Sequence, residues 1–387
     1  MKMHPQPLPG VLVVLVRPPQ AAIGGGGRST LQIALRLKSL NVEVRLVERS
    51  PALRAEYGTT VDAKVMNYSR GILGLNYIGG VVGAAIKSRS GFIYAYADYF
   101  QDTIVPAVVA AVITRKRLYV NVLDDERRAE DILPFPSLLK NRLRRRPEIL
   151  PFLEYAMFHG SRRLAVRIGT CLTASRFSAE YAKNVLHARR VLVIGRGVDS
   201  QFFEAGQLQQ TVDGLYVGRF DVYKRVSMLV KAWKLVVARR PEAKLMLVGE
   251  SGKEFGPVTQ LVKDLGISQN VVFVGHVTSR GELAGLMRAS RLFIFPSIKE
   301  GFGRAVAEAM AAGVPCVLSD IAPFRELYSD AAVFAEPDDA SGFAGAILDL
   351  LDDEAKRLEC SRRSLVVARK FSWDTVARKV LLAMTSQ

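Results

Sequence analysis

The chain has 387 residues, 49% of them apolar and 24% charged, an ordinary globular balance that excludes a disordered, collagen-like or disulfide-scaffold chain. Lysine and arginine number 54 against 37 acidic residues, so the net charge of +17 predicts an anionic partner or surface. The excess is uneven: residues 1–200 hold 30 basic and 15 acidic residues (+15), whereas the remainder holds 24 and 22 (+2). The first half of the chain is therefore expected to meet that partner.

The N-terminal region predicts a strand rather than a targeting segment. The apolar run at residues 11–16 is shorter than the apolar region of a signal peptide, and glycine-rich sequence follows it. A longer uncharged run at residues 71–86 is too short to cross a bilayer and predicts a buried helix. Three cysteines (Cys171, Cys316 and Cys360) lie far apart without a C-x-x-C spacing, which predicts reduced thiols in a cytosolic protein.

Short β-branched runs alternate with segments of helical periodicity along the whole chain, which predicts parallel sheets covered by helices on both faces. The predicted strands are residues 11–16, 43–47, 92–97, 117–122, 169–174, 214–218, 244–248, 271–274, 292–296 and 315–319. Ten strands are many for one open sheet of this type. The sequence therefore predicts an α/β fold of two doubly wound Rossmann-like domains facing across a cleft, with the boundary at the Gly195–Asp199 turn.

A glycine-rich stretch at residues 24–27 follows the first predicted strand and precedes a helix. Glycines at that place let backbone N–H groups approach a phosphate. The stretch departs from the dinucleotide fingerprint at Ser29 and from the P-loop pattern at Ala22 and Arg28. A tight turn required only for packing remains an alternative.

Two cations, Arg219 and Lys224, flank the loop after the first strand of the second half. An arginine fork and a lysine point charge suit a diphosphate and the negative charge that grows on it as it leaves. Two solvated surface cations are the alternative interpretation.

Residues 295–315 carry the strongest pattern. A strand ends at Pro296, a loop contains Glu300, and a helix begins near Gly303 with Glu308 further along it. The N–H groups at the helix start suit hydroxyl or phosphate oxygens, and a carboxylate accepts hydrogen bonds from adjacent sugar hydroxyls. The alternatives are an i,i+4 salt bridge between Arg304 and Glu308 and a solvated loop acid at Glu300.

The two glutamates form E-x7-E within E-G-F-G-x4-E-A-M-A-x-G-x-P at residues 300–315, and residues 218–224 read G-R-x4-K. In this pattern the chain resembles the retaining family-4 glycosyltransferases of GT-B fold. Residues 273–276, 325–326 and 371–373 also match the family in order and spacing. The resemblance covers nearly the whole chain.

The resemblance implies a hexosyltransferase that takes a UDP- or GDP-sugar as donor, without metal or cofactor, and a glycan or lipid-linked acceptor. It divides the chain into an acceptor-binding domain at residues 1–199, a nucleotide-sugar-binding domain at 200–368, and a helix at 369–387 that packs back towards the first domain. Carried over residue by residue, it makes Arg219, Lys224 and Glu300 catalytic. Its donor-binding residues are Glu308, Gly301, Phe302, Gly303, Gly218, Gly24 and Gly25.

One departure from the family lies near the end of a strand of the first domain. Many members carry a histidine there, whereas this chain has Leu123 followed by Asp124. Two alternatives therefore stay open. One is a metal-dependent transferase that uses Asp124, Asp125 and Glu126. The other is a nucleotide-sugar-binding protein without catalysis.

A basic stretch at residues 138–146 mixes leucines with cations and predicts an interfacial helix that docks on anionic lipid. A solvated helix face is the alternative, and no nucleic-acid recognition motif is present. The expected location is the cytoplasm, with peripheral attachment to the inner face of the cell membrane. The cations expected on this acceptor and membrane side are Arg142, Arg144, Arg145 and Arg146.

Overall fold

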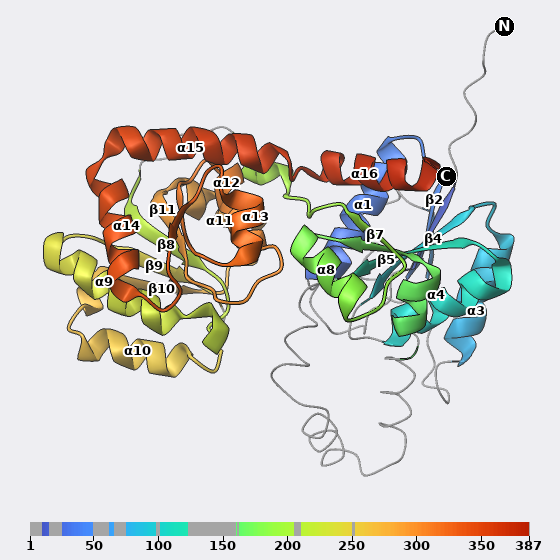
Figure 1. Ribbon diagram of the computed structural model, residues 1–387, viewed down its shortest axis with the longest axis horizontal. Helices are drawn as coiled ribbons and strands as arrows, with labels where there is room; N and C mark the ends of the chain where they lie inside the picture. The colour runs from blue at the N-terminus through green and yellow to red at the C-terminus, as the bar shows by residue number, and fades with distance from the viewer. Residues whose placement is uncertain are drawn as a thin grey trace, which may run out of the picture. The chain divides into compact units, whose positions relative to one another are not determined.

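The structure is a computed structural model of the chain. The residues that it describes are 10–14, 25–48, 62–65, 75–97, 101–122, 160, 162–204, 210–249 and 252–386. The chain divides into two compact units. Unit 1 combines Met1–Gly197 with Trp373–Gln387, and unit 2 is Val198–Ser372. Each unit contains one parallel sheet with helices packed on it (Figure 1).

The sheet of unit 1 has the order β3-β2-β1-β4-β5-β6-β7, with every pair parallel. Its strands are β1 (Val11–Val14), β2 (Val44–Glu48), β3 (Asp62–Val65), β4 (Phe92–Ala97), β5 (Arg117–Val122), β6 (Thr170–Thr173) and β7 (Arg190–Val193). Its helices include α1 (Gly25–Ser39), α3 (Leu75–Lys87), α4 (Gln101–Thr114), α8 (Arg176–Asn184) and α16 (Trp373–Thr385).

Alternation along the strands gives this sheet two apolar faces, because successive side chains point to opposite sides. Ile93 and Val120 pack with α3, α4, α8 and residues 165–166, whereas Tyr94 and Tyr119 pack with α1 and α16. The last helix therefore belongs to unit 1, where Arg36 pairs with Asp374 at 3.1 Å. The sequence-based boundaries at 199 and 368 lie within a few residues of this division.

The sheet of unit 2 has the order β10-β9-β8-β11-β12-β13, which is the doubly wound nucleotide-binding order. Helix α9 packs with α10 and α14, and α12 packs with α11 and α15. The strands are β8 (Val212–Val217), β9 (Leu245–Val248), β10 (Val271–Gly275), β11 (Ser290–Phe295), β12 (Cys316–Ser319) and β13 (Val333–Ala335). The helices are α9 (Val226–Arg239), α10 (Phe255–Asp264), α11 (Arg280–Arg288), α12 (Arg304–Ala311), α13 (Ala322–Tyr328), α14 (Ala340–Asp352) and α15 (Glu354–Arg369).

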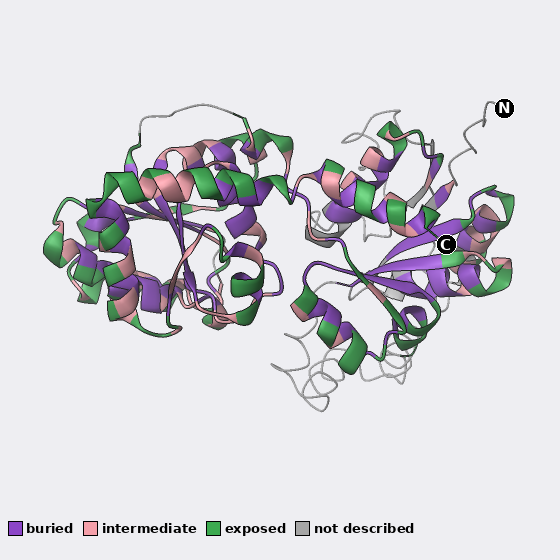
Figure 2. Ribbon diagram, turned by 45° about the horizontal axis from the view of Figure 1, so that its top comes forward, coloured by how far each residue is buried: buried purple, intermediate pink, exposed green. Residues whose placement is uncertain are grey.

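The predicted α/β fold class with two doubly wound sheets is confirmed. Most strand residues of both sheets are buried, and the helices turn their exposed residues outward (Figure 2). Three strands were not predicted: β3, β7 and β13 are only three or four residues long, and β7 is largely exposed. Among the described residues, no helix combines the length and the apolarity that a bilayer crossing requires.

Tight packing fixes the point where the chain passes between the units. A Cβ added to Gly197 would come within 2.0 Å of the Trp373 ring, so only glycine fits beneath that indole. The next residue, Val198, forms an isolated parallel bridge with Ser372, and its amide donates to the Phe371 carbonyl at 2.8 Å. The two chain segments that join the units are therefore held to each other.

Candidate functional site

The candidate site lies at the carboxyl ends of β8 and β11, which are neighbours in the sheet of unit 2. The chain leaves β8 through Gly218 and Arg219 into a short 3₁₀ helix, η4 (Val222–Lys224), and leaves β11 through residues 296–303 into α12. Ligands of open α/β sheets bind at this edge. The motifs predicted from the sequence are therefore brought to one place.

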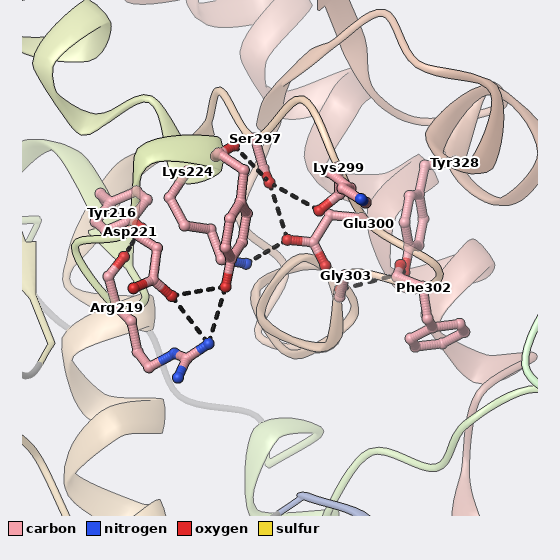
Figure 3. A network of polar contacts seen from close by, with 11 residues as sticks. Tyr216, Arg219, Asp221, Lys224, Ser297, Lys299, Glu300, Phe302, Gly303 and Tyr328 are labelled. Carbon is pink, nitrogen blue, oxygen red and sulfur yellow. Dashed lines mark hydrogen bonds and ion pairs between the residues drawn. The ribbon is translucent and has the colours of Figure 1, made fainter. Parts of the chain in front are cut away.

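Lys224 and Glu300 form an ion pair that is almost fully enclosed, with 11% and 8% of the side chains exposed (Figure 3). Ser297, which is completely buried, donates a hydrogen bond to Oε1 of Glu300 at 3.0 Å. The Lys224 ammonium also lies 4.7 Å from the centroid of the Phe295 ring. Lys224 and Glu300 belong to separate sequence motifs, and the fold brings them into contact.

Backbone contacts hold the two loops of this ion pair together. The Tyr223 carbonyl accepts a hydrogen bond from the Ile298 amide at 3.0 Å. Arg225 adopts the left-handed conformation (φ 54°) between η4 and α9, which turns the chain sharply after Lys224. A non-glycine residue in that conformation costs about 1–2 kcal/mol, so the surrounding contacts must hold it.

Arg219 is much more exposed than Lys224. Its side chain is 63% exposed, and its Nη2 contacts Oδ2 of Asp221 and the Tyr223 hydroxyl, each at 2.9 Å (Figure 3). Tyr223 in turn donates to Asp221 at 2.6 Å. The guanidinium is therefore accessible to a ligand, and Asp221 partly balances its charge.

Tyr216 fixes the loop that carries Arg219. Its hydroxyl donates to the Arg219 carbonyl at 2.8 Å, and a Cβ on Gly218 would come within 2.6 Å of that hydroxyl. Burial, and next the charge of Glu300, raise the pKa of Tyr216 well above its usual value. The phenol is therefore a neutral donor at every physiological pH. Tyr216 could not be identified from the sequence, because a tyrosine within a strand resembles an ordinary core residue.

Residues 301–303 form the turn that begins α12. Gly303 has a left-handed backbone (φ 75°), and the Tyr328 hydroxyl donates to the Phe302 carbonyl at 2.7 Å. The buried Phe302 ring packs edge-on against Tyr328 and Phe371. Because the first turn of a helix leaves its N–H groups without intrahelical acceptors, this anchored turn presents donors close to Glu300.

Glu308 is buried, with 3% of its side chain exposed, and it contacts two arginines. Nε of Arg304, one helical turn earlier on α12, lies 3.4 Å from Oε1 of Glu308. This is the salt bridge that the alternative interpretation of the sequence proposed. Arg280 also forms an ion pair with Glu308, and its Nε donates to Asp199 at 3.0 Å while its guanidinium lies over the Phe202 ring. Burial acts to lower the pKa of Arg280, but the charges and hydrogen bonds of Glu308 and Asp199 together outweigh it, so the pKa of Arg280 is raised.

Arg280 could not be predicted from the sequence, because no motif surrounds it and only the packing of α11 on α12 brings it to Glu308. Several predicted residues lie outside the described part of the chain. They are Gly24, Leu123, Asp124, Asp125, Glu126 and the basic residues Arg142, Arg144, Arg145 and Arg146. Gly25 begins α1. In the described ranges, no three His, Cys, Asp or Glu side chains gather as metal ligands.

Two doubly wound sheets with this site define the GT-B class, and solved structures agree with it over nearly the full chain. A glycosyltransferase from Rickettsia africae ESF-5 superposes with a TM-score of 0.75 at 17% identity, covering 98% of each chain. Anabaena Alr3699/HepE in complex with UDP and glucose superposes with a TM-score of 0.72 at 19% identity, covering 98% of this chain and 100% of that one. At these identities the likeness establishes the fold.

Residues 199–365 match the family described as glycosyl transferases group 1. It is 32% identical over 170 residues to the O-antigen chain mannosyltransferase B of Escherichia coli, covering 44% of each chain. The chain spans about half the length, or less, of the curated relatives it matches.

Proposed function

We propose that this protein transfers a hexose from a UDP- or GDP-sugar to a glycan or lipid-linked acceptor, with retention of the anomeric configuration and without a metal ion. The observation that carries the proposal is the buried Lys224–Glu300 pair beside the accessible Arg219. Fixed charges at the carboxyl edge of a nucleotide-binding sheet suit a diphosphate sugar. The E. coli relative is named as a mannosyltransferase, which also supports a hexosyl donor.

The bond that breaks joins the sugar to the diphosphate, so negative charge grows on the leaving oxygens. Lys224 and Arg219 stabilise that charge, and because their loops are anchored before the ligand arrives, little reorganisation is needed. Glu300, oriented by Lys224 and Ser297, accepts hydrogen bonds from sugar hydroxyls. The N–H groups of residues 301–303 donate to the same sugar or to its phosphate.

Glu308 binds the ribose hydroxyls of the nucleotide. Its carboxylate is buried and held by Arg280 and Arg304, so it stays in one orientation. The glycine-rich stretch that contains Gly24 and Gly25 contacts the phosphates or the acceptor. The leaving phosphate takes the acceptor proton on the face it departs from, which accounts for retention without a separate general base.

The acceptor meets unit 1, which carries most of the positive charge. Within the part of the chain that the structure does not describe, Arg142, Arg144, Arg145 and Arg146 would hold an anionic leaflet. Changing these four arginines to glutamine should then weaken cosedimentation with anionic liposomes. Unchanged cosedimentation would remove this stretch from the proposal.

A thermal-shift screen of nucleoside diphosphates tests the donor class. A ligand at 100 times its dissociation constant adds about 2.7 kcal/mol of stability, which raises the Tm of a unit of this size by about 5–11 °C. We expect UDP or GDP to give this shift, and Glu308→Ala to reduce it. If no nucleoside diphosphate raised the Tm, the proposed donor class would be wrong.

A further inference from the structure

The amino edge of the sheet in unit 1 carries an unusual surface. All its strands are parallel, so the connections from α3, α4, residues 162–168 and α8 enter β4, β5, β6 and β7 at the same edge. We define the basic edge as residues 84–92, 111–117, 165–170 and 181–190, each running from the last helical turn to the start of a strand.

The basic edge contains nine cations and no acidic residue (2 + 3 + 1 + 3 in chain order). Five large apolar side chains are exposed on it, from 47% to 64% of their surface. The cations are Lys87, Arg89, Arg115, Lys116, Arg117, Arg167, Lys183, Arg189 and Arg190, and the apolar residues are Ile86, Val112, Ile113, Ile168 and Val185.

Cations are common at the ends of helices, because they complement the helix dipole, so unit 2 serves as an internal comparison. The five equivalent connections of unit 2 are residues 236–245, 261–271, 285–290, 308–316 and 325–333. They hold six cations and five acids, and none of their large apolar residues is exposed. With the α1–β2 connection (residues 36–44) included, the five connections of unit 1 hold eleven cations and one acid, Glu43, which pairs with Arg45 at 3.1 Å. The helix dipole acts equally in both units and does not explain the difference.

The backbone conformation at the turns of the basic edge also differs from that at the equivalent turns of unit 2. After helices α10 and α12 of unit 2, the left-handed positions are Gly266 and Gly313, the residue type that such positions prefer. After α4 and α8 of unit 1, they are Arg115 (φ 55°) and His187 (φ 56°), both exposed. Two turns of the basic edge therefore hold a non-glycine residue in this less favourable conformation.

The first two connections are also joined into one surface. Lys116 donates through Nζ to the Ser88 carbonyl at 2.7 Å, and the Arg117 amide donates to the Gly91 carbonyl at 3.1 Å. These bonds bring the end of α3, with Ile86, beside the end of α4, with Val112 and Ile113. The result is a group of exposed aliphatic side chains among cations.

We propose that the basic edge docks unit 1 on an anionic lipid bilayer, where the aliphatic side chains enter the headgroup region and the cations contact lipid phosphates. Charge alone would also suit a nucleic acid or an anionic glycan. Exposed isoleucine and valine favour the bilayer, since bases are bound by stacking on aromatic or planar side chains. The inference rests on unit 1 alone and does not depend on the proposed donor chemistry.

The experiment is cosedimentation of the full chain with vesicles of phosphatidylcholine alone or of an equimolar mixture with phosphatidylglycerol. The edge variant carries Arg89→Gln, Arg115→Gln, Arg167→Gln and Arg189→Gln, all at exposed positions. The matched control removes the same charge from unit 2, through Lys231→Gln, Lys234→Gln, Arg239→Gln and Lys263→Gln, also exposed.

We expect the wild type to bind the anionic vesicles, the edge variant to lose about tenfold or more in vesicle affinity, and the control to stay within about twofold. Ile86→Ser with Ile113→Ser should remove the binding that survives high salt. Wild-type binding that is equal on both vesicles, or an edge variant that binds like its control, would overturn the proposal. RNA binding with no vesicle binding would assign the surface to the other class of partner and would also overturn it.

Calorimetric titration of the edge variant with UDP and GDP separates this result from the proposed function. The variant should bind nucleotide like the wild type, because its changes lie in unit 1 and the site described above lies in unit 2. If the wild type bound vesicles but no nucleotide, the donor proposal would fail and the docking surface would stand.

Discussion

Removing one partner of the Lys224–Glu300 pair should destabilise unit 2 more than removing both. Lys224→Met leaves the Glu300 carboxylate in a site where 8% of that side chain is exposed, with Ser297 as a remaining hydrogen-bond donor. Breaking a buried ion pair on one side costs about 3–5 kcal/mol, and we take about 3 because Ser297 still solvates the carboxylate. Unit 2 spans 372 − 198 + 1 = 175 residues, so this loss lowers its Tm by about 6–12 °C.

The double variant Lys224→Met with Glu300→Gln removes both charges and should recover most of that loss, because no unpaired charge remains. Chemical denaturation followed by circular dichroism measures the four corners of this cycle. Lys231→Met on the exposed face of α9 is the control and should leave stability within about 0.5 kcal/mol. If Lys224→Met were as stable as the wild type, the Lys224–Glu300 ion pair would not be buried enough for an unpaired Glu300 carboxylate to destabilise unit 2.

The remaining predictions concern donor chemistry. Arg219→Ala should leave the Tm unchanged, because the side chain is largely exposed, and should lower kcat by about 10²–10³ in a transfer assay; near-normal turnover would exclude a role on the diphosphate. Glu308→Ala should weaken nucleoside diphosphate binding by about 1.5–3 kcal/mol in calorimetry. Unchanged affinity would mean that Glu308 only forms salt bridges with Arg280 and Arg304. Arg280→Ala should raise KM for the donor more than it lowers kcat, with partial rescue by Arg280→Lys; an effect on kcat alone would contradict a positioning role. Turnover should continue in excess chelator, whereas loss restored by manganese would favour Asp124 and its acidic neighbours.

The parts predicted from the sequence are those that local pattern determines. Strands such as β4, β5 and β11 are runs of mostly buried apolar residues, and the loop-to-helix turn is marked by Gly303, whose left-handed backbone favours glycine. Three short strands, β3, β7 and β13, escaped prediction. The three residues of β13 carry no periodicity, and their pairing with β12 decides their conformation.

The contacts that complete the site depend on tertiary packing. Nothing in the sequence near Arg280 connects it to Glu308, 28 residues away, and nothing near Tyr216 indicates that its hydroxyl holds the Arg219 carbonyl. The basic edge escaped prediction for the same reason, because its cations come from four separate connections. The positive charge of the first half of the chain is a count from the sequence, whereas the gathering of nine of its cations at one edge of the sheet depends on the fold.

Sugar transfer from radiolabelled donor tests the central claim most directly. Wild type and the double variant Lys224→Met with Glu300→Gln are each incubated with labelled UDP- and GDP-hexoses and a panel of glycan and lipid-linked acceptors. The anomeric configuration of the product is then determined. We expect transfer with retained configuration by the wild type, and a loss of about 10²-fold or more in the folded double variant. Equal transfer by both proteins, or an inverted product, would contradict the account.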